Sequence, residues 1–242
     1  MNEVILGDCL EVMKSIDDAT IDMVLCDMPY GITGCKWDTP IDLEHLWAHY
    51  KRIIKPGGAI VLTATMPFGA RLIMSNPKWF RHEIIWEKSN CSNPLEANKA
   101  PLRVHENILI FCDRRALYNP QKTKGKPYIA RVKGLPFSNQ NYRERIDTIN
   151  TSGDRYPRSV LKFNKDRKLI HSTQKPVALF EWLIRTYSNE GDLILDNCSG
   201  SGTTAIAAMN CGRNYILIEK DEKYYELSKE RINKEVKEKK DE

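Results

Sequence analysis

The sequence predicts an α/β fold with a doubly wound, mostly parallel sheet, and three observations lead to this prediction. Short apolar segments alternate with segments of helical periodicity over most of the 242 residues, as in sheets whose two faces are covered by helices. One region, 113–168, lacks both patterns. The polar and glycine-rich motifs follow directly after apolar segments, where open α/β sheets bind their ligands.

The first half of the chain supplies most of the expected strands. Short apolar runs predict strands at 4–6, 21–26, 59–63, 84–86 and 107–111. Helical periodicity predicts helices at 9–15, 42–54 and 66–75. The segment Lys55-Pro56-Gly57-Gly58 should end the second helix and turn the chain into the strand at 59–63.

Regular patterns return after Pro176. Helices are expected at 177–187, at 203–210 and from about 222, and strands at 193–196 and 215–218. Residues 113–168 are instead rich in Pro, Gly, Asn and basic residues, with aromatic residues interleaved. We therefore expect one core domain formed by 1–112 and 169–242, with 113–168 inserted into it.

Composition favours a soluble, cytoplasmic protein without a membrane span. Hydrophobic residues make up 41%, the mean hydropathy is −0.49, and no apolar run reaches the ~18 residues that a span requires. The first residues lack the basic and apolar regions of a secretion signal. The seven cysteines include no Cys-x-x-Cys pair, which favours reduced thiols. His45 and His49 lie on one helix face without a third ligand, so we expect no metal.

The charge of the chain is concentrated in the expected insertion. Residues 113–168 hold fifteen Lys and Arg against five Asp and Glu, a local charge of +10, so the rest of the chain carries −5 of the net +5. A basic segment on a mildly acidic body is typical of a polyanion-binding surface. The alternative interpretation is a solvated loop without a partner.

A glycine loop late in the chain indicates a nucleoside-binding site. The expected strand at 193–196 leads into Gly200 and Gly202, which permit a tight turn and a close approach of a ligand to the backbone. Glu219, at the end of the next strand, can accept both ribose hydroxyls. The spacing from Gly200 through Gly202 to Ala205 also fits a dinucleotide fold. Too few strands follow Glu219 for that fold, so the remaining strands must come from upstream, which implies a circularly permuted order.

The segment Asp27-Met28-Pro29-Tyr30 follows another expected strand. It is compatible with an ordinary turn, since Asp and Pro are common turn residues. Its position at the carboxyl end of a strand favours a functional role, and its chemistry fits the methylation of an amine. The Asp27 carboxylate and the Met28 carbonyl can accept the two N–H bonds of an exocyclic amine, and Tyr30 can stack on the base.

These motifs resemble those of the amino-DNA methyltransferases of bacteria and phages. Asp27-Met28-Pro29-Tyr30 resembles their Asp-Pro-Pro-Tyr motif, and 196–204 resembles their glycine loop. The segment at 7–9 resembles their adenine-contacting segment, and 171–176 resembles their His-Pro-Thr-Gln-Lys-Pro segment. The order, with the catalytic motif first and the glycine loop last, is similar to that of the beta group.

The resemblance implies a fold, a cofactor and a partner. The fold is the Rossmann-like mixed sheet of S-adenosylmethionine-dependent methyltransferases, circularly permuted and carrying the basic insertion. The core at 1–112 and 169–242 becomes the catalytic domain, and 113–168 becomes the target-recognition insertion. S-Adenosyl-L-methionine is the implied cofactor and DNA the implied partner. Relatives in the beta group often dimerise, so a homodimer is a further expectation.

The resemblance also assigns individual residues. The catalytic residues are Asp27, Met28, Pro29 and Tyr30. The cofactor-binding residues are Asp8, Cys9, His171, Thr173, Gln174, Lys175, Asp196, Ser199, Gly200, Gly202, Thr203, Thr204, Glu219 and Lys220. Three departures occur: Met28 and Ser172 each replace a proline, and Asn197-Cys198 replaces a common Pro-Phe, which removes an aromatic contact to the cofactor.

The expected target is N6 of adenine, because Asp at the first motif position usually accompanies adenine in this family. N4 of cytosine remains the alternative. Methylation of cytosine C5 needs a nucleophilic cysteine, typically after proline, and no Pro-Cys pair occurs. Cys26 is therefore interpreted as strand packing, and 105–107 as the start of a core strand without a chemical role.

A base within a duplex must be flipped out before it can be methylated, and the basic insertion can supply the contacts that offset this cost. The expected DNA-binding residues are Arg114, Arg115, Lys122, Lys124, Lys126, Arg131, Lys133, Arg143 and Arg145. Two other functions are compatible with the motifs: methylation of RNA or of a protein amide, and a non-catalytic nucleic-acid-binding subunit. The intact motif residues argue against the second.

Overall fold

The computed structural model describes residues 2–31, 38–130, 148–166 and 174–239. Six residues with an expected role lie outside this part of the chain: His171, Thr173, Arg131, Lys133, Arg143 and Arg145. The chain divides into two compact units. The larger comprises Met1–Asn119 and Ser159–Glu242, and the smaller comprises Pro120–Arg158.

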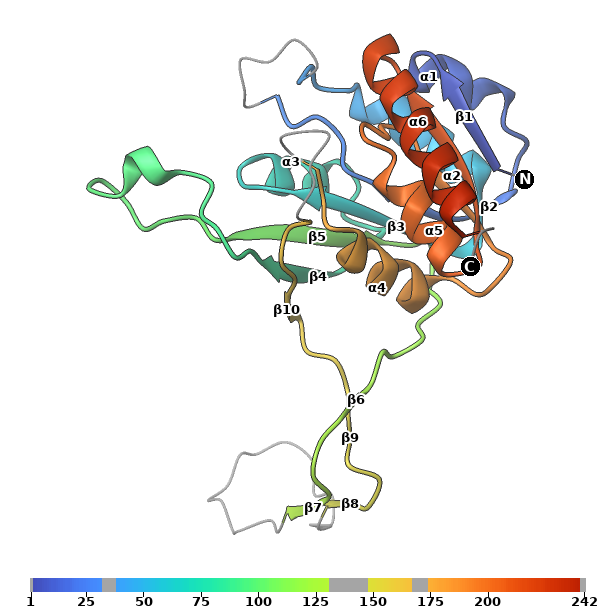
Figure 1. The fold of residues 1–242 in the computed structure, drawn as a ribbon. Helices are drawn as coiled ribbons and strands as arrows, with labels where there is room; N and C mark the ends of the chain where they lie inside the picture. The colour runs from blue at the N-terminus through green and yellow to red at the C-terminus, as the bar shows by residue number, and fades with distance from the viewer. Residues whose placement is uncertain (1, 32–37, 131–147, 167–173, 240–242) are drawn as a thin grey trace. The chain divides into compact units, whose positions relative to one another are not determined.

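The larger unit is built on an eight-stranded sheet with the strand order β1-β12-β11-β2-β3-β5-β4-β10 (Figure 1). The strands are β1 (Asn2–Leu6), β2 (Ile21–Cys26), β3 (Ile54–Ala64), β4 (Phe80–Glu87), β5 (His105–Phe111), β10 (Val160–Lys162), β11 (Leu193–Asp196) and β12 (Asn214–Glu219). Strand β5 runs antiparallel to both β3 and β4, whereas the other pairs are parallel. The sheet is therefore mixed.

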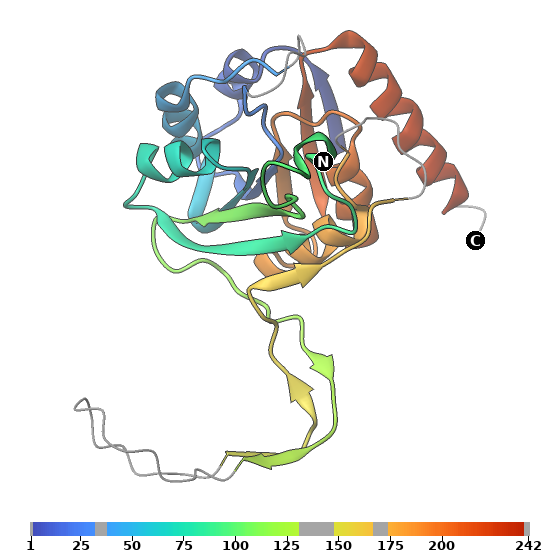
Figure 2. The ribbon, with the colours of Figure 1, turned by 90° about the vertical axis from the view of Figure 1, so that its left-hand side faces the viewer.

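Helices cover both faces of this sheet, as Figure 1 and Figure 2 show. The helices are α1 (Cys9–Val12), α2 (Leu43–Ile53), α3 (Phe68–Ser75), α4 (Val177–Tyr187), α5 (Thr203–Asn210) and α6 (Glu222–Glu238), with short 3-10 turns η1 (Met13–Ser15) and η2 (Pro94–Glu96). Successive residues of β2 belong to different clusters. Val24 packs with α1, α2 and α3, whereas Met23 packs with α4, α5 and α6. This alternation produces the two cores of the doubly wound fold that the sequence predicted.

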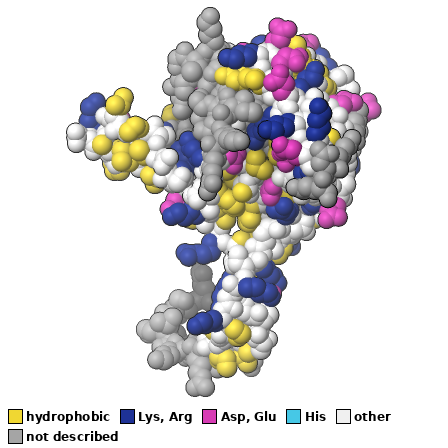
Figure 3. All heavy atoms as spheres, in the orientation of Figure 1, with side chains coloured by type: hydrophobic (Ala, Val, Ile, Leu, Met, Phe, Trp, Pro, Cys, Tyr) yellow, Lys and Arg dark blue, Asp and Glu magenta, His cyan; other side chains and the backbone are white. Residues whose placement is uncertain are grey.

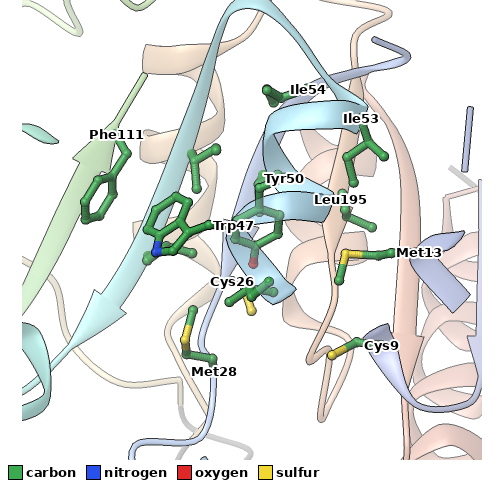
Figure 4. Close-up of a cluster of buried hydrophobic side chains, with 14 of the residues drawn as sticks. Cys9, Met13, Cys26, Met28, Trp47, Tyr50, Ile53, Ile54, Phe111 and Leu195 are labelled. Carbon is green, nitrogen blue, oxygen red and sulfur yellow. The ribbon is translucent and has the colours of Figure 1, made fainter. Parts of the chain in front are cut away.

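The first of these cores lies under α2 (Figure 4). Asp42 caps the helix, since its carboxylate accepts the amide protons of Glu44 and His45 at 2.9 and 3.2 Å. Trp47 and Tyr50 project from its buried face, and the Tyr50 hydroxyl donates to Asn197 Oδ1 at 2.5 Å. The core thus reaches the loop that follows β11 and supports it from below.

The segment at 55–58 does not separate helix from strand, so that prediction is wrong. Strand β3 begins at Ile54, directly after α2, and its register with β2 shifts between Ile21 and Met23. Gly58 allows this arrangement because it lies against β2: an added Cβ would be 2.7 Å from the carbonyl oxygen of Asp22. Close packing against a neighbouring strand is a tertiary constraint that the local Pro-Gly-Gly pattern does not reveal.

The expected insertion at 113–168 also differs from the prediction. Its last part contributes β10 to the main sheet, paired with β4, and Trp86 Nε1 donates to the carbonyl of Phe163 at 3.0 Å. Three strand residues are too few for a periodic pattern to reveal. The smaller unit has two short antiparallel pairs: β6 (Thr123–Lys124) with β9 (Asp154–Arg155), and β7 (Tyr128–Ala130) with β8 (Thr148–Asn150).

Two kinds of feature are absent from the described residues. None of their helices has the length and apolar character needed to cross a membrane. No group of three or more His, Cys, Asp or Glu side chains within them is arranged to hold a metal ion.

Replacing Gly58 with alanine should destabilise the chain, because the new methyl group would overlap the backbone of β2. We expect a loss of about 1–3 kcal/mol in the free energy of unfolding, measured by urea denaturation. Gly69→Ala is the control. Gly69 lies within α3, its added Cβ would meet Ala64 at an ordinary 3.4 Å, and alanine favours a helix by about 0.5–1 kcal/mol. A Gly58→Ala protein as stable as the wild type would contradict the packing described above.

Candidate active site

The candidate site lies at the carboxyl ends of the parallel strands. β1, β2, β11 and β12 end at this edge, and the antiparallel β5 begins there. A cavity of about 970 Å³ occupies it. The expected site residues that line the cavity are Asp8, Cys9, Asp27, Met28, Pro29, Tyr30, Gln174, Lys175, Asp196, Ser199, Gly200, Thr203, Glu219 and Lys220. Residues far apart in the sequence are thereby brought to one cavity.

Glu219 and the glycine loop form one half of the cavity. The Gly200 amide donates to Glu219 Oε2 at 2.7 Å, and the Asp221 amide donates to Oε1 at 2.9 Å. Each carboxylate oxygen keeps a second lone pair, so the pair of oxygens can still accept two hydroxyl groups. Burial raises the pKa of Glu219 above its ordinary value, although the backbone amides oppose the shift.

Asp8 stabilises the end of β1, which neighbours β12 in the sheet. Its carboxylate caps α1 by accepting the Leu10 amide at 3.0 Å, and its other oxygen accepts from Lys220 Nζ at 3.0 Å. The hydrogen bond from Lys220 lowers the pKa of Asp8. This contact ties the end of β1 to the end of β12, so Asp8 and Glu219 stay on the same wall.

Two features of the loop show that this half fits a polar ligand. The Ser199 hydroxyl is buried and has no hydrogen-bond partner among the described residues, which is unfavourable unless a ligand or water satisfies it. At Gly200, nothing in the described structure lies within 4 Å of the position of a Cβ, so a ligand can approach the backbone. The donors and acceptors present therefore suit an adenosine-type cofactor.

Gly202 and Thr204 lie beneath the loop rather than on the cavity wall. Gly202 has a φ of +73° and caps α5. The Thr204 hydroxyl donates to Asp196 Oδ2 at 2.5 Å, and the Cys198 amide donates to Oδ1 at 3.1 Å. Burial raises the pKa of Asp196 to about 7. Gly202 and Thr204 therefore stabilise the shape of the loop from outside the cavity, a role that the sequence did not distinguish from contact with a ligand.

Asp27 is the centre of the other half of the cavity. Its Oδ1 accepts from the Tyr30 hydroxyl at 2.8 Å and from the Thr63 hydroxyl of β3, and these two hydroxyls lie 2.9 Å apart. Its Oδ2 accepts from Lys175 Nζ at 2.6 Å. Asp27 is thus oriented from three sides at the point where β2 ends.

Tyr30 is fixed by the same contacts. Its ring stacks on Phe68, with centroids 5.2 Å apart and planes at 28°. Burial raises the pKa of Tyr30 well above its ordinary value, and the Asp27 carboxylate adds to the rise. The hydroxyl therefore stays protonated and acts as a donor. The expected stacking of Tyr30 on a base remains a prediction.

Two charged residues that the sequence reasoning overlooked complete this half. Glu106 Oε2 lies 3.2 Å from Lys175 Nζ, and Glu106 Oε1 lies 3.0 Å from Lys88 Nζ. The sequence assigned no chemical role to Glu106. One signal was available: a glutamate stands near the start of β5, just before the apolar run Ile108–Phe111, and charged residues are rarely buried unless paired.

Cys26 has the packing role that the sequence predicted. It is fully buried, and burial raises its pKa to about 12, so its thiol is unsuited to act as a nucleophile. Cys198 lines the cavity and lies in the loop where the resemblance would place an aromatic ring. Asn197 of the same loop is buried and bonded to Tyr50, so this position is part of the interior.

On one mixed, doubly wound sheet, a single cavity is lined by a glycine loop with Glu219 and by a second acidic group around Asp27. The chain belongs to the DNA methylase family of the N6/N4 type, whose pattern matches residues 21–230. It is 29% identical to the type II methyltransferase M.HinfI of Haemophilus influenzae over 262 aligned positions, which cover 96% of this chain and 68% of that protein. The expected family is confirmed.

Solved structures agree in fold. The complex of M1.HpyAVI with SAM matches with a TM-score of 0.65 and 24% identity, covering 96% of this chain and 100% of that one. The cytosine-N4-specific PvuII DNA methyltransferase matches with a TM-score of 0.65 and 17% identity, covering 97% and 90% of the two chains. The expected methyltransferase fold is confirmed.

Asp196 should make the chain less stable as the pH rises. The pKa of Asp196 is about 7 in the folded chain against an ordinary 3.8, so the folded state binds the proton more tightly than the unfolded state does. The contribution of the protonated carboxyl group to stability is complete below pH 3.8 and is lost as the pH rises to about 7. Asp196→Asn cannot ionise. As the pH rises from about 5 to about 8, the free energy of unfolding of the variant should increase by about 1–3 kcal/mol relative to that of the wild type, measured by urea unfolding.

Asp17→Asn, at an exposed aspartate, is the control for the removal of one carboxylate. A difference between Asp196→Asn and the wild type that does not change with pH would contradict the raised pKa.

Proposed function

We propose that this DNA methylase transfers a methyl group from S-adenosyl-L-methionine to N6 of adenine in DNA. One observation carries the proposal: the Asp27 carboxylate, at the end of β2, lies on the same cavity as Glu219 and the glycine loop. An amine held at Asp27 would therefore share the cavity with a nucleoside held at Glu219. That M1.HpyAVI was solved with SAM supports the cofactor.

The residues of the glycine half would hold the cofactor. Glu219 would accept the ribose hydroxyls, Asp8 and Cys9 would lie at the adenine, and Ser199 and Gly200 would meet the methionine portion. The unpartnered Ser199 hydroxyl would gain an acceptor or donor there. When bound, S-adenosylmethionine supplies a methyl group activated by a positively charged sulfur.

The residues of the Asp27 half would prepare the base. An exocyclic amine is a poor nucleophile because its lone pair is delocalised into the ring. By accepting its two N–H bonds, the Asp27 carboxylate and the Met28 carbonyl would localise that lone pair on nitrogen. Since Tyr30, Thr63 and Lys175 already fix Asp27, little reorientation is needed when the base enters.

Adenine is favoured over cytosine by the aspartate at position 27. Cytosine N4 is the second candidate, because PvuII methyltransferase, which has the same fold, is named as cytosine-N4-specific. RNA and protein amides are further alternatives that a product analysis separates.

The product should be N6-methyladenine. Purified protein would be incubated with methyl-labelled S-adenosylmethionine and unmethylated genomic DNA, and the digested nucleosides analysed by mass spectrometry. Asp27→Ala should reduce incorporation by about 10²–10³-fold while cofactor affinity, measured by calorimetry, stays near the wild-type value. Asp17→Ala, at an exposed aspartate outside the cavity, should be fully active.

Other products would change the proposal. Labelled N4-methylcytosine would show that cytosine rather than adenine is the target base, and it would leave the site assignment intact. Incorporation into RNA or protein, but not DNA, would overturn the choice of substrate. Full activity of Asp27→Ala would overturn the role of Asp27.

The basic segment is proposed to contact DNA. In the smaller unit, Lys122, Lys124 and Lys126 are exposed, and Figure 3 shows Lys and Arg side chains gathered on its surface. Lys122 Nζ lies 4.7 Å from the centre of the Tyr156 ring, and Lys124 pairs with Asp154 at 2.5 Å. These contacts orient Lys122 and Lys124. Of the other described candidates, Arg114 and Arg115 belong to the larger unit.

Replacing Lys122, Lys124 and Lys126 together with glutamine should weaken DNA binding at every sequence. Each lost phosphate contact should reduce the slope of log K against log salt by about 0.9, measured by fluorescence anisotropy at several salt concentrations. The matched control replaces Lys229, Lys234 and Lys237 of α6 with glutamine, which removes the same charge. Equal effects of the two triple variants would show a general charge effect and would contradict a specific DNA surface.

A further inference from the structure

Four charges of alternating sign form a continuous row at the Asp27 half of the cavity, with both lysines buried and both acids half-buried. The row runs from Lys88 to Glu106 at 3.0 Å, from Glu106 to Lys175 at 3.2 Å, and from Lys175 to Asp27 at 2.6 Å. The exposed fractions of these side chains are 4% for Lys88, 13% for Glu106, 6% for Lys175 and 24% for Asp27. Each residue comes from a different part of the chain, and together the four charges sum to zero.

Such a row is costly unless every charge is balanced. Removing one member of a buried ion pair leaves an uncompensated charge, which destabilises a protein far more than the pair stabilises it. Glu106 is the member with two partners, since each of its oxygens meets one ammonium group. Lys88 is also held by its backbone, whose amide donates to the Val104 carbonyl at 2.7 Å. Glu106 is thus placed with little freedom beside Lys175.

The position of Glu106 matters because Asp27 would have to accept from a substrate amine in addition to its existing donors, of which Lys175 is the charged one. Lys175 already donates to Asp27 Oδ2, and a substrate amine would donate to the same carboxylate. An unbalanced ammonium group would draw electron density from Asp27 and weaken it as an acceptor. A second carboxylate on Lys175 offsets that attraction and gives the ammonium group another acceptor when the amine arrives.

We propose that Glu106 is a positioning residue of the methyl-transfer site and that Lys88 is the counter-ion that fixes it. Glu106 holds the Lys175 ammonium group in place and balances its charge, so that Asp27 can accept the amine of the base. The inference rests on the proposed function of Asp27. It adds two residues from β5 and from the end of β4 that no motif of the family resemblance contains.

The charge state of Lys175 provides a direct readout. Burial opposes its charge, but the carboxylates of Asp27 and Glu106 outweigh burial and raise the pKa of Lys175. The other groups facing it are the protonated Tyr30, whose ring centre lies 5.9 Å from Nζ, and Lys88, which acts through Glu106. Loss of the Glu106 charge should therefore lower the pKa of Lys175, and loss of the Lys88 charge should raise it.

The first experiment measures methyl transfer in single turnover. Glu106→Gln should slow it by about 10- to 100-fold, as expected for the loss of a positioning contact, with the affinity for S-adenosylmethionine changed less than about threefold by the same reasoning. The alkaline limb of its pH–rate profile should move to lower pH. Lys88→Met combined with Glu106→Gln restores the net charge of the row and should recover part of the lost rate.

The second experiment needs neither cofactor nor DNA. The Nζ resonance of Lys175, labelled with ¹⁵N and assigned by its loss in Lys175→Met, is titrated by NMR in each variant. It should titrate at lower pH in Glu106→Gln and at higher pH in Lys88→Met. If Glu106→Gln does not fold, Glu106→Asp retains the charge at a shorter reach, and its rate should then fall while the Lys175 titration stays near that of the wild type.

The matched control is the nearby pair Glu87 and Lys162, which is 3.2 Å apart and exposed. Glu87→Gln with Lys162→Met removes the same two charges outside the cavity and should change neither readout. Unchanged transfer in Glu106→Gln, an unmoved Lys175 titration, or a double variant no faster than Glu106→Gln would each overturn the proposal. A wild type that methylates no DNA, with the Lys175 titration shifting as expected, would instead overturn the proposed substrate and leave the charge row standing.

Discussion

The parallel pairing of β1, β12, β11 and β2 is the constraint on which the rest of the structure depends. Parallel strands end at the same edge of a sheet, so the residues after each strand meet there although they are far apart in the sequence. In this chain the pairing brings Asp8, Asp27, Asp196 and Glu219 to one cavity. Four carboxylates at one edge repel each other, and the structure compensates each one differently.

The compensation separates the roles of these carboxylates. Asp8 is matched by Lys220 at the surface, and Asp27 by the buried Lys175. Glu219 receives backbone amides, whereas Asp196 is buried beneath the loop with a pKa of about 7. A charged group that is kept available for a ligand needs partners that leave some of its lone pairs free. Asp196 differs from the other three acids because both of its oxygens are bonded within the loop, so the local environment rather than the residue type distinguishes these acids.

Much of the fold and site was predictable because its signals are local. The strand, glycine turn and helix start around Gly200 lie within about a dozen consecutive residues, and Asp27 follows its strand directly. The start of β3 and the short β10 were not predictable in this way. One depends on how closely Gly58 packs against β2, and the other is a strand only because β4 is beside it.

The sequence by itself determined the class of fold, the family, and the residues at both halves of the cavity, because strand ends, glycine turns and acidic motifs are written in consecutive residues. Only the tertiary structure decided which of these residues face the cavity and which support it. It also decided that Lys175 reaches Asp27 across 148 positions of sequence, and that Glu106 and Lys88 extend this contact into a balanced row. The physical reason is that electrostatic pairing acts through space, and no sequence pattern fixes which distant charges a folded sheet brings together.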